Sequence, residues 1–77
     1  MNKVLFFAHL RDAVGAEFLM LDAAGKTVVE LKAQLAEKYD LPRLETVMTA
    51  INEEFASNDE QISDGDEVAF IPPVSGG

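Results

Sequence analysis

Residues 27–39 carry the one long helical pattern in this chain, and that pattern limits the folds open to it. Thr27 and Glu30 have the spacing of a capping box, which begins a helix. The predicted apolar face consists of Val28, Leu31, Leu35 and Tyr39, with Ala36 beside them. The face expected to meet water consists of Glu30, Lys32, Gln34, Glu37 and Lys38. Because Pro42 disfavours helical geometry before it, the helix should end near Asp40.

The other apolar segments are short and have the composition of strands. We expect strands at residues 3–10, 18–21, 47–51, 54–56 and 67–71. Residues 11–15 should form a connection with Gly15 as its turn residue, and this short spacing favours an antiparallel hairpin. Loops are expected at residues 22–26 and in the polar, turn-rich segment 57–66.

The order of these elements predicts the architecture. One helix must cover a mixed sheet of four to five strands, because no other element can bury the apolar face of the sheet. If the last strand lies beside the first, it is a parallel neighbour at the centre, and its apolar run from Val68 to Ile71 suits that burial. This is an α+β fold of the β-grasp, or ubiquitin-like, type. We expect residues 1–71 to form the domain and residues 72–77 to form a flexible tail.

The tail, Pro72-Pro73-Val74-Ser75-Gly76-Gly77, has the chemistry of a projecting arm. The prolines fix φ and cannot donate ladder hydrogen bonds, so they end the pairing and favour an extended path. The glycines lack Cβ atoms and can enter a channel too narrow for side chains. Fully extended, such a segment reaches roughly 20 Å. The alternative is an idle terminus, since chain ends are commonly unordered.

The composition excludes several classes of function. Fourteen acidic residues against six basic ones give a net charge of −8, which repels nucleic acid and anionic membranes but leaves a basic protein partner possible. The absence of cysteine removes disulfides, thiolate nucleophiles and most structural zinc sites. No apolar stretch approaches the ~20 residues of a membrane span, so we expect a soluble cytoplasmic protein.

No motif indicates an active site, metal or cofactor bound by this chain alone. Gly25-Lys26-Thr27 resembles the end of a phosphate-binding loop, but Met20 occupies the position of its first glycine, so we interpret Thr27 as a helix cap. The acidic residues of 59–67 lack the spacing of a calcium loop. His9 has no supporting serine or carboxylate spacing, and we expect a strand histidine with a satisfied ring.

Aromatic side chains suggest a partner surface on the sheet. Phe6 and Phe7 point to opposite faces of the first strand, and only one can easily face the helix. The other is expected on an open face, with Phe55 and one of Phe70 or Ile71. The alternative is that loops cover both phenylalanines.

With these residues identified, the chain resembles the MoaD family of sulfur carriers, the small subunits of molybdopterin synthase. The matching pieces are Lys3-Val4-Leu5-Phe6-Phe7-Ala8, Arg11, Val14-Gly15, Thr27-Val28 with Leu31, Ala50-Ile51-Asn52, and Asp64-Gly65-Asp66-Glu67-Val68-Ala69-Phe70 running into the tail. Ile71 stands where the family often has a second phenylalanine, and residues 40–46 match poorly.

The resemblance implies that a ubiquitin-activating-type adenylyltransferase uses ATP to adenylate the Gly77 carboxylate, so this chain itself binds no cofactor. A sulfur-donating enzyme then converts it to a thiocarboxylate, with Gly76 letting the backbone pass. The tail enters the large synthase subunit, in a heterotetramer, and gives sulfur to cyclic pyranopterin monophosphate to form the molybdopterin dithiolene. The residues expected to bind partners are Phe7, Arg11, Phe55, Ile71, Pro72, Pro73, Val74 and Ser75.

Three other functions stay open on the sequence. One is a sulfur carrier for thiamin thiazole synthesis, although Phe70-Ile71-Pro72-Pro73 before the tail favours molybdopterin. Another is a ubiquitin-like modifier joined through Gly77 to lysines of other proteins. The last is a β-grasp interaction module whose tail is idle.

Overall fold

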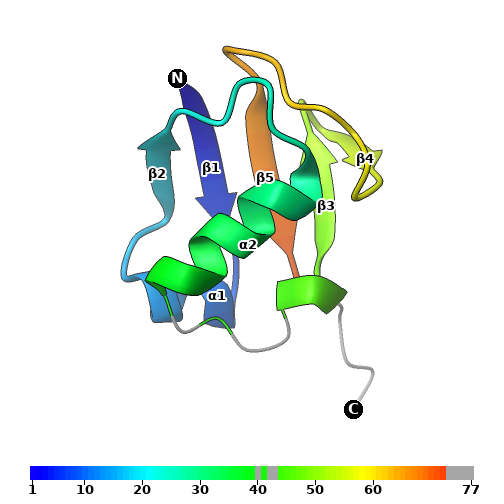
Figure 1. Cartoon of the computed structure of the whole chain (residues 1–77). Coiled ribbons are helices and arrows are strands. Elements are labelled where there is room, and N and C mark those ends of the chain that lie inside the picture. Colours follow the sequence, from blue (N-terminus) through cyan, green and yellow to red (C-terminus); the bar gives the residue numbers. More distant parts are fainter. Residues whose placement is uncertain (40, 42–43, 73–77) are drawn as a thin grey trace.

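The computed structural model describes residues 1–39, 41 and 44–72, and it shows one sheet with a long helix across one face (Figure 1). The helices are α1 (His9–Val14), α2 (Val28–Lys38) and the short 3-10 helix η1 (Leu44–Thr46). The strands are β1 (Asn2–Phe6), β2 (Phe18–Leu21), β3 (Met48–Ile51), β4 (Glu54–Ala56) and β5 (Glu67–Ile71). The last four strands lie within a residue of their predicted positions.

The sheet has five strands in the order β2-β1-β5-β3-β4, with β5 at its centre (Figure 1). β5 runs parallel to β1, with Val4 opposite Val68 and Phe6 opposite Phe70. β1 pairs antiparallel with β2, and β3 pairs antiparallel with both β4 and β5. The predicted hairpin and the predicted place of the last strand are therefore confirmed, and the arrangement is a β-grasp fold.

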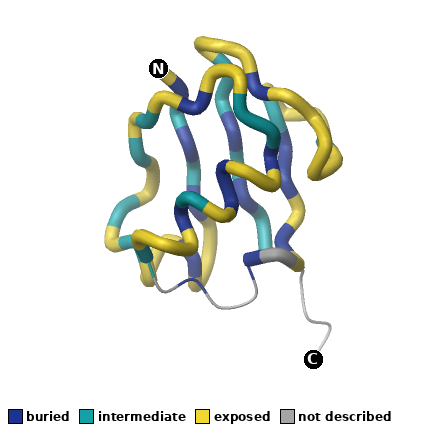
Figure 2. The backbone as a smooth tube through the Cα atoms, viewed as in Figure 1, coloured by how far each residue is buried: buried dark blue, intermediate teal, exposed yellow. Residues whose placement is uncertain are grey.

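The core lies between α2 and the side of β1 and β5 that faces this helix (Figure 2). The rings of Phe6 and Phe70 are both buried, with centroids 6.1 Å apart. The helix contributes Val28, Leu31 and Leu35, which are buried as their spacing predicted. Of the two phenylalanines in question, Phe6 therefore faces the core.

The start of α2 follows the predicted capping box. The Thr27 hydroxyl accepts a hydrogen bond from the backbone N–H of Glu30 at 3.3 Å, and the Glu30 carboxylate accepts from the backbone N–H of Thr27 at 2.8 Å. These bonds satisfy donors that the first helical turn leaves unpaired. Thr27 is thus a helix cap, as predicted.

The first strand is shorter than predicted, and the expectation of a strand over residues 3–10 is wrong at its end. β1 stops at Phe6, the backbone turns at Ala8 with a φ of 53°, and α1 follows as far as a cap at Gly15 with a φ of 84°. Leu10 is buried because α1 folds it back against the core. A continuous apolar run cannot separate a strand from a short buried helix. His9 consequently begins a helix and is exposed, which corrects its assignment to a strand.

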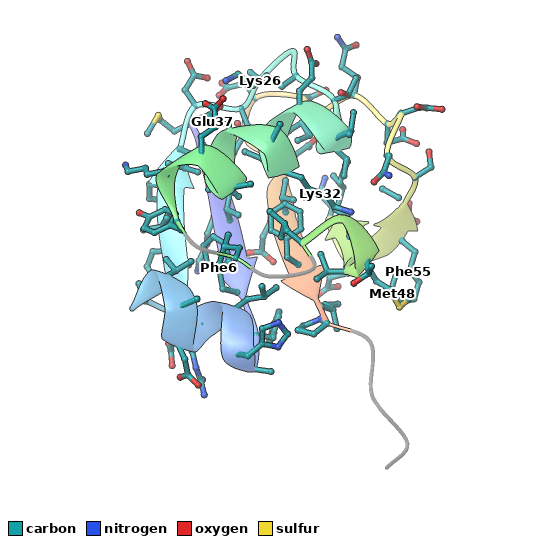
Figure 3. All side chains as sticks on the ribbon, turned by 60° about the horizontal axis from the view of Figure 1, so that its bottom comes forward. Phe6, Lys26, Lys32, Glu37, Met48 and Phe55 are labelled. Atoms are coloured by element: carbon teal, nitrogen blue, oxygen red, sulfur yellow. The ribbon has the colours of Figure 1, made fainter. Side chains whose placement is uncertain are left out.

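Two side chains of α2 lie on the opposite side from the one predicted. Lys32 is buried, and its Nζ donates to the Val47 carbonyl and to Asn58 Oδ1, each at 3.1 Å (Figure 3). Ala36 is exposed. The residue before β3 and the loop after β4 lie on the side of the helix that carries Lys32. The Lys32 amine finds hydrogen-bond acceptors there, while its aliphatic stem is buried.

A hydrogen-bonded turn connects β3 and β4 to the start of β5. Asn52 and Glu53 have φ values of 52° and 71°, as a two-residue hairpin turn requires. The side chain of Asn52 donates to Asp66 Oδ1 and accepts from the backbone N–H of Glu67, both at 2.9 Å. Asp66 Oδ2 also accepts from the Ser63 backbone N–H at 2.9 Å. The Asp66 carboxylate therefore holds together two loops that are distant in sequence.

Stability should depend on pH through Asp66. The Ser63 N–H and then the Asn52 side chain donate to its carboxylate and lower its pKa. A lowered pKa stabilises the fold above the unfolded value, about 3.9, and that contribution disappears as pH falls through the folded value. We expect Asp66→Asn to be less stable than wild type at neutral pH, with the difference shrinking below about pH 4. Urea unfolding across this range measures it. Asp59→Asn, which removes one charge elsewhere, is the control, and an identical pH profile for both variants would contradict the prediction.

Candidate partner-binding face

The face of the sheet opposite α2 carries a row of apolar side chains. The strand register aligns Phe18, Leu5, Ala69, Ala50 and Phe55 from one edge of the sheet to the other. Large rings lie at both edges, whereas Ala69 and Ala50 lie in the middle. Because alanine fills little volume, the centre of this row is lower than its ends.

A depression of about 310 Å³ occupies this low centre. Its lining consists of Leu5, Phe7, Ala50, Glu53, Phe55, Glu67, Ala69 and Ile71. Phe7 is 44% exposed and Phe55 is 71% exposed, so two aromatic rings meet solvent around an apolar floor. Met48 lies near Phe55 at the β3–β4 edge (Figure 3). We call these lining residues and Met48 the docking face, because exposed apolar surface of this kind is typical of protein interfaces.

The central strand connects the docking face to the tail. Ala69 and Ile71 of β5 line the depression, and Pro72 follows directly as a half-buried residue. Residues 73–77, with the predicted site residues Pro73, Val74, Ser75, Gly76 and Gly77, lie outside the described part of the chain. A protein seated on the docking face would therefore cover the strand from which the tail begins.

The structure brings three of the predicted partner-binding residues together and separates a fourth. Phe7, Phe55 and Ile71 line one depression. Arg11 instead lies on α1, half-exposed, with its Nη1 3.8 Å from Glu17 Oε1 beside a different hollow. The expectation that one face gathers the aromatic residues fits this geometry, while their role in binding a partner stays a prediction.

Sequence reasoning missed several members of the docking face, namely Leu5, Met48, Ala50, Glu53, Glu67 and Ala69. The alternation of side chains along β1 and β5 could have identified Leu5, Glu67 and Ala69, since they lie on the same face of the sheet as Phe7 and Ile71. The hollow itself depends on the register of neighbouring strands, which no single segment reveals.

The described residues offer no metal site or membrane span. Across residues 1–39, 41 and 44–72, no three His, Cys, Asp or Glu side chains are grouped so as to hold a metal ion. Within the same ranges, no helix has the length and apolar character needed to cross a bilayer.

Comparison with known proteins identifies the family. A model described as the ThiS family matches residues 4–77. The chain belongs to the ThiS family. This ThiS-family chain is 41% identical over 81 residues to the molybdopterin synthase sulfur carrier subunit of Escherichia coli (strain K12), with 100% of both chains covered. The resemblance to sulfur carriers seen in the sequence is thereby confirmed.

Two solved structures share the fold of this ThiS-family chain. One is a chain in the complex of subunit 1 and 2 of molybdopterin-converting factor from Helicobacter pylori 26695, with a TM-score of 0.70, 31% identity and coverage of 99% of this chain and 97% of that one. The other is small archaeal modifier protein 1 from Methanosarcina acetivorans, with a TM-score of 0.76, 28% identity and coverage of 99% and 95%. These likenesses confirm the β-grasp fold.

Proposed function

We propose that this chain is the sulfur carrier subunit of molybdopterin synthase. Its Gly77 carboxylate would be converted to a thiocarboxylate and would donate sulfur to cyclic pyranopterin monophosphate, forming the molybdopterin dithiolene. The observation that carries the proposal is the 41% identity, over the full length of both chains, to a sulfur carrier subunit of that enzyme. The chain itself supplies the carrier, and the active site belongs to the large subunit.

The chemistry of a carboxylate explains the need for further partners. A carboxylate is a poor electrophile until adenylation gives it a leaving group. A ubiquitin-activating-type enzyme would use ATP to adenylate the carboxylate, and sulfur from a sulfur-donating enzyme would then displace the AMP. Gly77 suits this reaction because a residue without Cβ leaves its terminal carbonyl unhindered. No cofactor need be bound by the carrier.

The docking face and the tail have complementary roles in the proposed complex. The large subunit would cover the depression around Ala69 and receive the segment that follows Pro72. The prolines reduce the entropy lost when that segment is threaded. We also propose that the reaction takes place in the cytoplasm. A net charge of −8 disfavours nucleic acid and anionic membranes as partners, because it repels both kinds of surface.

Mass spectrometry tests the proposal directly. Purified protein co-expressed with its activating enzyme and a sulfur donor should gain the mass of one oxygen-to-sulfur exchange at its C-terminus. Protein expressed without the activating enzyme is the control and should show no gain. No gain in the presence of an activating enzyme shown to consume ATP with this chain would count against a sulfur carrier.

The likeness to small archaeal modifier protein 1, at a TM-score of 0.76, favours a second candidate, a modifier attached through Gly77 to lysines of other proteins. It would appear as adducts of higher mass on denaturing gels, lost when Gly76 and Gly77 are deleted. If such adducts form and the pterin gains no sulfur, the second candidate function would replace the first.

A further inference from the structure

Two carboxylates border the apolar depression of the docking face at one end. Glu53 lies in the β3–β4 turn and Glu67 begins β5, and both side chains line the hollow together with Leu5 and Phe55. We infer that the large synthase subunit inserts an arginine into this depression, with its guanidinium seated between Glu53 and Glu67. The inference rests on the proposed function and names the chemistry of the partner at that same face.

The turn fixes the backbone of Glu53 next to the start of β5. Glu53 has a φ of 71°, and its neighbour Asn52 is held by its backbone N–H, which donates to the Glu67 carbonyl at 2.8 Å, and by its side chain, which accepts from the Glu67 N–H at 2.9 Å. These two bonds join the turn to the first residue of β5. Glu53 and Glu67 are therefore presented together on a rigid part of the sheet.

No cation of the described chain is paired with these carboxylates. The ion pairs within residues 1–39, 41 and 44–72 join the Met1 amine to Asp64 and Arg11 to Glu17. Lys3 is opposite Glu67 in the register, but its Nζ lies 4.6 Å from the ring centroid of Phe18, toward β2. A net charge of −8 on the chain makes these carboxylates complementary to a basic group on a partner.

The shape of the depression favours arginine over lysine. A guanidinium is planar and can donate to two carboxylates at once while it stacks on an aromatic ring. Phe55, at 71% exposed, offers such a ring beside the two carboxylates. The aliphatic stem of arginine would cover the floor formed by Leu5 and Ala69. A strongly hydrated ammonium would gain less from an apolar hollow.

Calorimetric titration of the intact carrier with its large subunit tests this inference. We expect the double variant Glu53→Gln/Glu67→Gln to bind about tenfold more weakly than wild type, as loss of a close interfacial charge pair does. Its binding should also depend less on salt. The matched control is Glu37→Gln/Asp22→Asn, which removes the same charge at two exposed residues outside the depression and should bind within about twofold of wild type. Figure 3 shows Glu37 on the outer side of α2.

Two results would overturn the inference while leaving the proposed function intact. The double variant could bind the large subunit as tightly as wild type, or the control pair could weaken binding equally through the loss of net charge alone. Thermal unfolding confirms that each variant is folded. If wild type itself fails to bind the large subunit and gains no thiocarboxylate, the proposed function and this inference fail together.

Discussion

Removal of Gly77 should reduce sulfur transfer to below detection while leaving the domain folded. Each residue of an extended chain contributes about 3.3–3.6 Å, so the new terminal carboxylate would stop short of the reacting atoms by that distance. A misplacement of only about 1 Å can lower a rate on the order of 10²-fold. Sulfuration of the pterin, measured by product formation with the large subunit present, should therefore fall by at least that factor.

Two further variants separate the loss of the terminal Gly77 carboxylate from a shorter tail and from an unrelated substitution. One residue added after Gly77 converts its carboxylate into an amide without shortening the tail, and this variant should be equally inactive. Glu37→Gln on α2 leaves the whole tail intact and should retain most of the activity. Thermal unfolding should be unchanged in all three variants, because the core consists of residues from the domain. Full activity of the extended variant, with mass spectrometry showing no trimming, would exclude Gly77 as the sulfur-bearing residue.

The topology could be derived from the sequence because few arrangements of one helix and several strands bury all of their apolar faces. One capped helix and several apolar runs leave a single sheet covered on one face, and the most apolar run belongs at the centre. That reasoning located α2 and the parallel pairing of β1 with β5. It did not locate α1, whose six residues carry too little pattern to separate a short helix from a strand.

Buried polar groups were beyond prediction because their partners are distant in sequence. Asn2 is fully buried, and its side chain donates to the carbonyls of Ser63 and Asp66 and accepts from the N–H of Ala23. Lys32 is buried and bonded to acceptors from the residue before β3 and from the loop after β4. Neither environment can be read from a local pattern, since each depends on loops that the fold brings together.

The aromatic residues of the candidate site could be predicted from the sequence, whereas the hollow between them could not. Phe7 and Phe55 stand out in the sequence as large apolar side chains in segments predicted to be strands. Ala50 and Ala69 are unremarkable until the register places them side by side and produces the hollow. Arg11 was grouped with the face by resemblance, yet α1 carries it to a different hollow.

Phe55→Ala should weaken binding of the large subunit by about 30-fold or more, while the folded domain loses little stability. Aromatic residues that border a desolvated pocket commonly contribute at least about 2 kcal/mol, which corresponds to roughly that factor. The free energy of unfolding should change by no more than about 0.5 kcal/mol, because Phe55 is 71% exposed in the isolated chain. Titration calorimetry and urea unfolding of the same samples measure the two quantities.

A second variant tests the shape of the docking face rather than its aromatic edge. Ala69→Leu fills the hollow from its floor, away from the core, and should weaken binding to a similar extent as Phe55→Ala. Val29→Ala removes an apolar side chain, 48% exposed, from the helix layer and should bind as wild type does. Equal affinity for all three variants would mean that the large subunit holds the carrier by its tail alone. A loss in Phe55→Ala and Ala69→Leu, without one in Val29→Ala, would instead locate the interface on the open face of the sheet.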